Sequence, residues 1–228
     1  MANENKNKEK QENVDIAGAV GKVELFLDSN KKLIWGIIAA VVVVAAVSYA
    51  CFKWVYMPAK QEAQAQMYKA ESAFRSSEWD IALNGDGNAL GFAQIISDYG
   101  SKAGKSVYMY AAACALQLGD ADGALSYIAK YNGKDEILAG RALCIKGDAL
   151  CIKGEYAAAA AAFKAAAAKS DNVFSAGYLL KAGQALEADG NPAEALKCYE
   201  TVKDQYPQSM EAYDIDKYIA RVTVKEEK

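Results

Sequence analysis

Residues 33–52 form a run of twenty positions without a charged side chain, LIWGIIAAVVVVAAVSYACF. A helix rises about 1.5 Å per residue, so this stretch would be about 30 Å long, which matches the hydrocarbon core of a bilayer. Trp35 lies near one end, and Trp54 and Tyr56 lie beyond the other, where aromatic rings favour the headgroup regions. The sequence therefore predicts one transmembrane helix over residues 33–56.

Three other interpretations of this run compete with a transmembrane helix. A soluble core helix is seldom apolar on every face for five turns. A cleaved signal peptide has small residues at cleavage spacing in Ser48-Tyr49-Ala50, but its apolar region should span only about 7 to 15 residues. A lipidated Cys51 would need an aliphatic or small residue where Tyr49 stands. A membrane span is the interpretation that the run favours.

Lysines on the two sides of the run set the expected orientation. Lys22, Lys31 and Lys32 precede it, whereas Lys53 and Lys60 follow it. The positive-inside rule then places the N-terminus in the cytoplasm of a single-pass inner (cytoplasmic) membrane protein, with the following domain in the periplasm. Free cysteines suit a reducing compartment and favour the opposite orientation, a receptor that faces the cytosol.

The composition excludes several classes of function. The net charge is −3 without a basic stripe, so no nucleic-acid partner is expected. The chain has no histidine, which removes the usual general base and the commonest metal ligand. The five cysteines form no CxxC pair and no metal-ligand spacing. We expect no enzyme, no catalytic residue, no cofactor, no metal and no small-molecule substrate.

The polar segment before the apolar run divides into two parts. Residues 1–15 carry mixed charge without periodicity and are expected to be disordered. Residues 16–32 place Ile16, Val20 and Val23 at helical spacing and predict an amphipathic pre-membrane segment. Such a segment either lies on the membrane or docks a partner.

The part of the chain after Pro58 predicts paired helices at a fixed period. Gly119, Gly154 and Gly190 begin turns 35 and 36 residues apart. Each glycine has a small residue seven positions before it, an alanine five positions after it and a bulky residue nine positions after it. These positions hold Ala112, Gly147 and Gly183; Ala124, Ala159 and Ala195; and Ile128, Phe163 and Tyr199. A helix-pair period near 34 is typical of tetratricopeptide repeats.

The chain accordingly resembles tetratricopeptide repeat (TPR) proteins, and the predicted fold is an all-α, TPR-like solenoid preceded by one transmembrane helix. The predicted TPR-like domain is 58–228. It comprises a degenerate repeat at 58–100, full repeats at about 105–138, 140–173 and 176–209, and a capping helix at 210–222. In the degenerate repeat we expect helices at 58–77 and 89–99, joined by a connection at 80–88.

Several short stretches also resemble single-span TPR proteins common in the Bacteroidota. They are ALNGDGN at 82–88, Gly91-Phe92, Lys181-Ala182-Gly183, YPQS at 206–209 and IDKYIA at 215–220. The resemblance implies the repeat fold and export to the periplasm. The layout is similar to that of the ancillary TPR subunit of the Sec translocon.

Two further motifs are incomplete. Residues 99–106 approach a phosphate-binding loop, but Tyr99 stands where glycine is required and no strand precedes it. Asn84, Asp86 and Asn88 mimic the first ligands of a calcium loop, whose closing glutamate is replaced by Ile95. Turns explain both stretches.

The repeat register also predicts a protein-binding groove along the inner helices. Its candidate residues are Met109, Ala113, Leu116, Arg141, Cys144, Asp148, Cys151, Leu180, Gln184 and Glu187. The lysine and asparagine pair of the well-known clamp for acidic C-termini is missing from these positions, so we expect an apolar segment as ligand. The predicted function is a membrane-anchored scaffold whose partner is a translocon, an envelope complex or an unfolded client.

Overall fold

The computed structural model describes residues 29–169 and 171–226, which are helical with connecting turns and contain no strand. The predicted all-α class is confirmed. The chain divides into two compact units, residues 1–58 and 59–228. The predicted disordered segment at 1–15 and most of the amphipathic segment at 16–32 lie outside the described residues.

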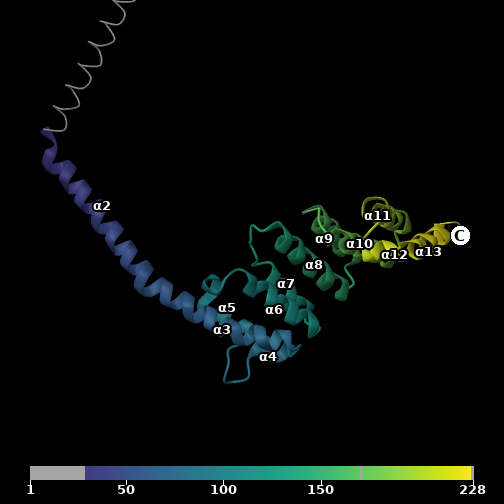
Figure 1. Cartoon of the computed structure of the whole chain (residues 1–228), viewed down its shortest axis with the longest axis horizontal. Coiled ribbons are helices and arrows are strands. Elements are labelled where there is room, and N and C mark those ends of the chain that lie inside the picture. Colours follow the sequence, from purple (N-terminus) through teal and green to yellow (C-terminus); the bar gives the residue numbers. More distant parts are fainter. Residues whose placement is uncertain (1–28, 170, 227–228) are drawn as a thin grey trace, which may run out of the picture. The chain divides into compact units, whose positions relative to one another are not determined.

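The first unit contains the apolar helix. Helix α2 (Lys31–Cys51) passes into a π-helical turn, η1 (Phe52–Tyr56), and helical structure continues into α3 (Met57–Arg75) (Figure 1). No residue of α2 is buried. An 18-residue stretch of the helical segment Lys31–Arg75 has a mean hydropathy of 2.4. Near the N-terminus the chain thus has one helix that is long and apolar enough to cross a membrane, among the residues described.

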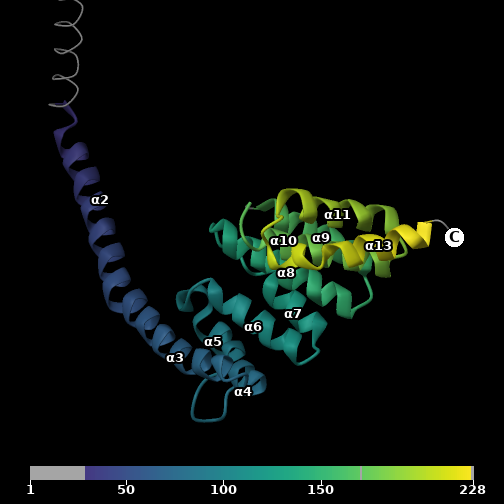
Figure 2. The same ribbon diagram turned by 45° about the vertical axis from the view of Figure 1, so that its right-hand side comes forward.

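The second unit is built from short helices that pack against their neighbours in sequence (Figures 1 and 2). After α3 these are α4 (Trp79–Asn84), α5 (Phe92–Tyr99), η2 (Gly100–Ala103), α6 (Ser106–Gln117), α7 (Ala121–Ile128), α8 (Glu136–Ile152), α9 (Tyr156–Lys169), α10 (Ser175–Ala188), α11 (Pro192–Gln205), α12 (Met210–Tyr213) and α13 (Ile215–Glu226). The most extensive contacts join α6 to α7, α8 to α9, α9 to α10 and α10 to α11. Four consecutive helices, from α8 to α11, thus form an unbroken series of packed neighbours.

One turn geometry recurs between the paired helices. Gly119, Gly154 and Gly190 have φ angles of 79°, 76° and 80°, in the left-handed region that glycine enters without a steric penalty. The N–H after each glycine donates to a carbonyl five residues earlier. These bonds run from Asp120 to Ala115, from Glu155 to Leu150 and from Asn191 to Leu186, all at 2.9 Å. This is the Schellman pattern of helix ends, and it reverses the chain in the same way each time.

A fourth copy of this turn stands at Ser77. Its φ is 60°, and the N–H of Glu78 donates to the carbonyl of Ala73 at 3.0 Å. Ala70, seven residues before Ser77, and Ala82, five residues after it, are buried like their counterparts in the other pairs. The expected connection at 80–88 is therefore wrong in its first half, because α4 begins directly after this turn.

A loop divides the second helix of this first pair. Residues 85–91 separate α4 from α5, and Phe92 lies fifteen residues after Ser77, six more than the nine that separate Tyr199 from Gly190. The Asp86 carboxylate accepts the N–H groups of Asn88 at 2.9 Å and Ala89 at 2.7 Å, which fixes the loop and lowers the pKa of Asp86.

The cores contain close contacts between a small residue and a large one. A Cβ added to Gly147 would lie 2.5 Å from Cε1 of Phe163, and one added to Gly183 would lie 2.6 Å from Cζ of Tyr199. Both rings are almost fully buried. Ala112 packs in the same cluster as Ile128. The spacing seen in the sequence thus corresponds to a helix contact that only a small side chain permits.

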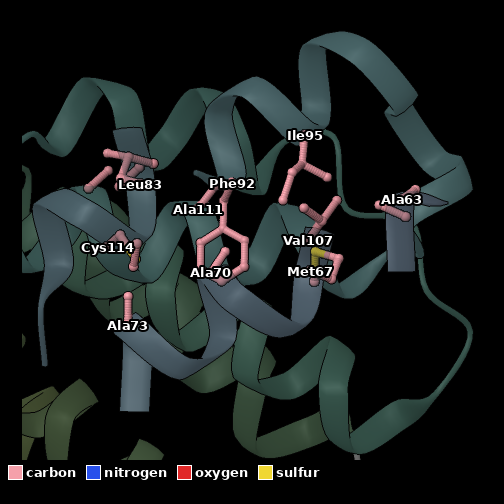
Figure 3. Packing of buried hydrophobic residues seen from close by; sticks show 14 of the residues in the cluster. Ala63, Met67, Ala70, Ala73, Leu83, Phe92, Ile95, Val107, Ala111 and Cys114 are labelled. Atoms are coloured by element: carbon pink, nitrogen blue, oxygen red, sulfur yellow. The ribbon is translucent and has the colours of Figure 1, made fainter. Parts of the chain in front are cut away.

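Aromatic rings hold the first helices together. Phe92 is fully buried and stacks on Tyr110 with ring centroids 5.2 Å apart, while Phe74 meets Tyr110 edge to face at 5.1 Å. Figure 3 shows Phe92 and Ile95 of α5 with Val107 of α6 and Met67 of α3 in this core. Such offset and edge contacts stabilise aromatic clusters beyond the burial of area.

The C-terminal end of the unit is capped by two helices, α12 and α13, where we predicted one at 210–222. Ile215 and Val222 of α13 are buried against the core that includes α11. Arg221 donates from Nε to Glu187 of α10 at 2.9 Å, and the Tyr199 hydroxyl donates to the same carboxylate at 2.6 Å. This network attaches the last helix to the preceding pair.

Candidate functional site

A groove of the second unit lies among α6, α8 and α10 and has a volume of about 410 Å³. Its apolar wall includes Leu116, Ile145, Phe174 and Tyr178, and its polar side chains include Arg141. A neighbouring cavity of about 330 Å³ shares Ala113, Arg141 and Ile145 with it and adds five residues of its own. These are Phe74, Ser106, Met109, Tyr110 and Leu138. We call the two cavities together the inner groove.

A lysine and an aspartate form an ion pair within this groove. Lys181 Nζ donates to both Asp148 carboxylate oxygens at 2.8 Å and lies 5.6 Å from the centroid of the Phe163 ring. Burial by itself would lower the pKa of Lys181, but the hydrogen bonds to Asp148 raise it above its ordinary value. Lys181 is therefore charged at neutral pH, and its ammonium group is held by the two carboxylate oxygens of Asp148.

The Cys144 thiol lies beside this pair, 3.8 Å from Asp148 Oδ2 and 3.7 Å from Lys181 Nζ. Burial, together with the negative charge of Asp148, raises the pKa of Cys144 to about 11. A nucleophilic cysteine needs a thiolate, so this thiol is unreactive at neutral pH. The cluster contributes shape and polarity to the groove.

The predicted groove residues separate into two groups. Ala113, Leu116, Arg141, Cys144 and Asp148 line the larger cavity, and Met109 lines its neighbour. Leu180 and Cys151 are half-buried against the core that includes Tyr199. Gln184 is exposed outside both cavities.

Glu187 serves a different purpose from the predicted one. Its side chain is 9% exposed and its carboxylate binds Tyr199 and Arg221. It stabilises the cap instead of facing the groove.

Sequence reasoning missed one wall of the groove. This wall consists of Val173, Phe174, Gly177, Tyr178, Lys181 and Glu211. The prediction used equivalent positions on each inner helix, whereas the cavity beside α8 is closed by the flank of α10. Phe174, Gly177 and Lys181 recur at intervals of three and four residues, which places them on one helix face and is the signal that could have found them.

The two motifs set aside in the sequence fold as turns. Residues 99–106 contain η2 and the start of α6, and Asp86 binds backbone N–H groups of its own loop. Within residues 29–169 and 171–226, no group of three or more His, Cys, Asp or Glu side chains is placed to hold a metal ion.

No protein-family model, no curated protein and no solved structure matches this chain.

Proposed function

We propose that this chain is a membrane-anchored TPR scaffold or adaptor that binds segments of other proteins in the inner groove. The observation that carries this proposal is the groove itself, whose two cavities are mainly apolar and share Ala113, Arg141 and Ile145. Protein segments bind helical grooves of this kind by burying apolar side chains in them.

The repeat geometry supports assignment to the TPR class. The period of 35 and 36 residues, the four turns of one kind and the small residues facing Phe163 and Tyr199 all follow from one repeated helix pair. In such arrays the inner helices line a concave surface, which is the usual place for a partner to bind.

The groove chemistry favours binding over catalysis. Its lysine and aspartate neutralise each other, and its thiol stays protonated at neutral pH. A nucleophilic cysteine must be ionised to react, and a pKa of about 11 keeps the Cys144 thiol protonated. We therefore propose a protein without enzymatic activity and without a cofactor.

Anchoring would hold the groove at a membrane surface. We propose that α2 spans the inner membrane with the N-terminus in the cytoplasm, so that the groove faces the periplasm. The partner would then be a translocon, an envelope complex or an unfolded client. A receptor facing the cytosol is the alternative, and protease protection in intact spheroplasts distinguishes the two orientations.

Co-purification from native membranes tests the binding function. The wild-type chain in mild detergent is compared with Phe174→Asp, which places a carboxylate on the groove wall, and with Glu200→Lys, a charge change at an exposed position of α11. We expect partner proteins with the wild type and with Glu200→Lys, and their loss with Phe174→Asp. Identical partners for all three variants would count against the groove.

A further inference from the structure

Arg141 is the one charged side chain that lines both cavities of the inner groove. It is exposed, and its guanidinium carbon lies 5.7 Å from the centroid of the Phe174 ring. Among residues 29–169 and 171–226 no carboxylate lies within ion-pair distance of it. The middle of an apolar groove thus contains a cation whose charge no neighbour neutralises.

The acidic groups around Arg141 are engaged elsewhere or lie farther off. Asp148 binds Lys181, and Glu71 pairs with Arg75 at 3.8 Å. Glu211 lines the larger cavity from α12, outside ion-pair distance of Arg141. An acidic group supplied by a ligand is therefore the natural counter-charge for this site.

Two tyrosines line the cavities that Arg141 also lines, Tyr110 the smaller one and Tyr178 the larger one. Burial raises the pKa of both tyrosines, and the charge of Arg141 acts in the opposite direction on each. Both hydroxyls thus stay protonated at neutral pH and are hydrogen-bond donors. Each of the two cavities is thus lined by Arg141 together with one tyrosine.

We propose, resting on the function proposed above, that the groove selects a protein segment with an internal aspartate or glutamate flanked on both sides by apolar residues. The carboxylate would bind Arg141, and the apolar side chains would fill the two cavities. Arginine suits this role because its planar guanidinium holds a carboxylate through two parallel hydrogen bonds. Because Arg141 lines both cavities, a ligand that fills both meets Arg141 within its length, so its acidic group is a side chain and not the chain terminus.

The expected preference is modest, since Arg141 is exposed to solvent. Ion pairs at exposed positions change an equilibrium by about fivefold at most, and salt weakens them. A segment with glutamate at the central position should therefore bind more tightly than the same segment with glutamine, by up to about fivefold.

Fluorescence anisotropy with synthetic peptides tests this preference. The full chain is placed in phosphatidylcholine nanodiscs, with empty nanodiscs as the control for binding to lipid. One peptide is blocked at both ends and carries leucines on both sides of a central glutamate; its partner has glutamine there. A third peptide has the glutamine and a free C-terminal carboxylate. Wild type is compared with Arg141→Gln and Phe174→Asp.

We expect the wild type to prefer the glutamate peptide by up to about fivefold, and Arg141→Gln to bind both blocked peptides as weakly as the wild type binds the glutamine peptide. Equal affinities in the wild type, or a preference that persists in Arg141→Gln, would overturn the inference while leaving the groove as a binding site. A preference for the free C-terminus over the internal glutamate would also overturn it. Failure of every peptide to bind, or binding unaffected by Phe174→Asp, would instead refute the proposed function.

Discussion

Substitution of Gly183 by alanine should destabilise the second unit, although alanine is the better helix former. Gly183 lies inside α10, where replacing glycine by alanine normally gains about 1 kcal/mol. Here the new methyl group would lie 2.6 Å from Cζ of Tyr199, a fully buried ring. The ring cannot move aside freely because its hydroxyl donates to Glu187 at 2.6 Å.

The magnitudes decide which effect wins. Overpacking a well-packed core costs about 1 to 3 kcal/mol, and a strained or broken hydrogen bond to a charged acceptor costs about 1.5 to 3 kcal/mol. Against the helix gain of about 1 kcal/mol, the net loss should be about 2 kcal/mol. For a domain of this size that corresponds to a melting temperature lower by about 4 to 8 °C.

Gly177, in the same helix, provides the matched control. A Cβ there would lie 3.0 Å from Oε1 of Glu211, the end of a flexible side chain that can move away. Gly177→Ala should therefore stabilise the chain by up to about 1 kcal/mol. Thermal unfolding of the full chain in detergent, followed by far-UV circular dichroism, measures both variants. Stabilisation of Gly183→Ala to the same extent as Gly177→Ala would refute the packing argument.

Three further perturbations follow from the structure. Ser77→Gly should raise the melting temperature, because a non-glycine residue in the left-handed region costs about 1 kcal/mol; no change in a melting curve would contradict this. Glu187→Ala should cost about 2 kcal/mol, since it leaves the Tyr199 hydroxyl without its acceptor and detaches Arg221; hydrogen exchange should then speed up in α13 more than in α6. Burial raises the pKa of Cys114 to about 12, so the folded chain keeps a proton that the unfolded chain releases above about pH 9. The contribution of Cys114 to the free energy of unfolding should be fully present below that pH and should fall as pH rises toward 12. In unfolding titrations, Cys114→Ala should reduce this loss.

The helix pairs were predictable because their turns depend on a property of one residue type. Glycine enters the left-handed region freely, so Gly119, Gly154 and Gly190 revealed the period. The equivalent turn at Ser77 escaped prediction because serine is seldom found in that conformation. The loop at 85–91 displaces the following helix, so the second helix of the pair was predicted only from residue 89 and α4 was taken for part of a connection.

The groove was only partly predictable, because its walls come from residues distant in sequence. Arg141 and Cys144 were identified from their positions on one inner helix. Lys181 was missed since its place in the groove depends on the contact between α8 and α10. Glu187 stands at a repeat position that was assigned to the groove. Its partner Arg221 is 34 residues away, so the sequence near Glu187 gives no sign of this ion pair.

Site-specific photo-crosslinking in intact cells tests most directly whether the inner groove holds other proteins. A photoreactive amino acid is placed at Leu116, in the groove, and at Glu200, at an exposed position of α11. A groove that binds protein segments predicts adducts of discrete size from position 116 that are absent from position 200 and are lost with Phe174→Asp. Identical adducts from both positions, or none from position 116, would contradict it.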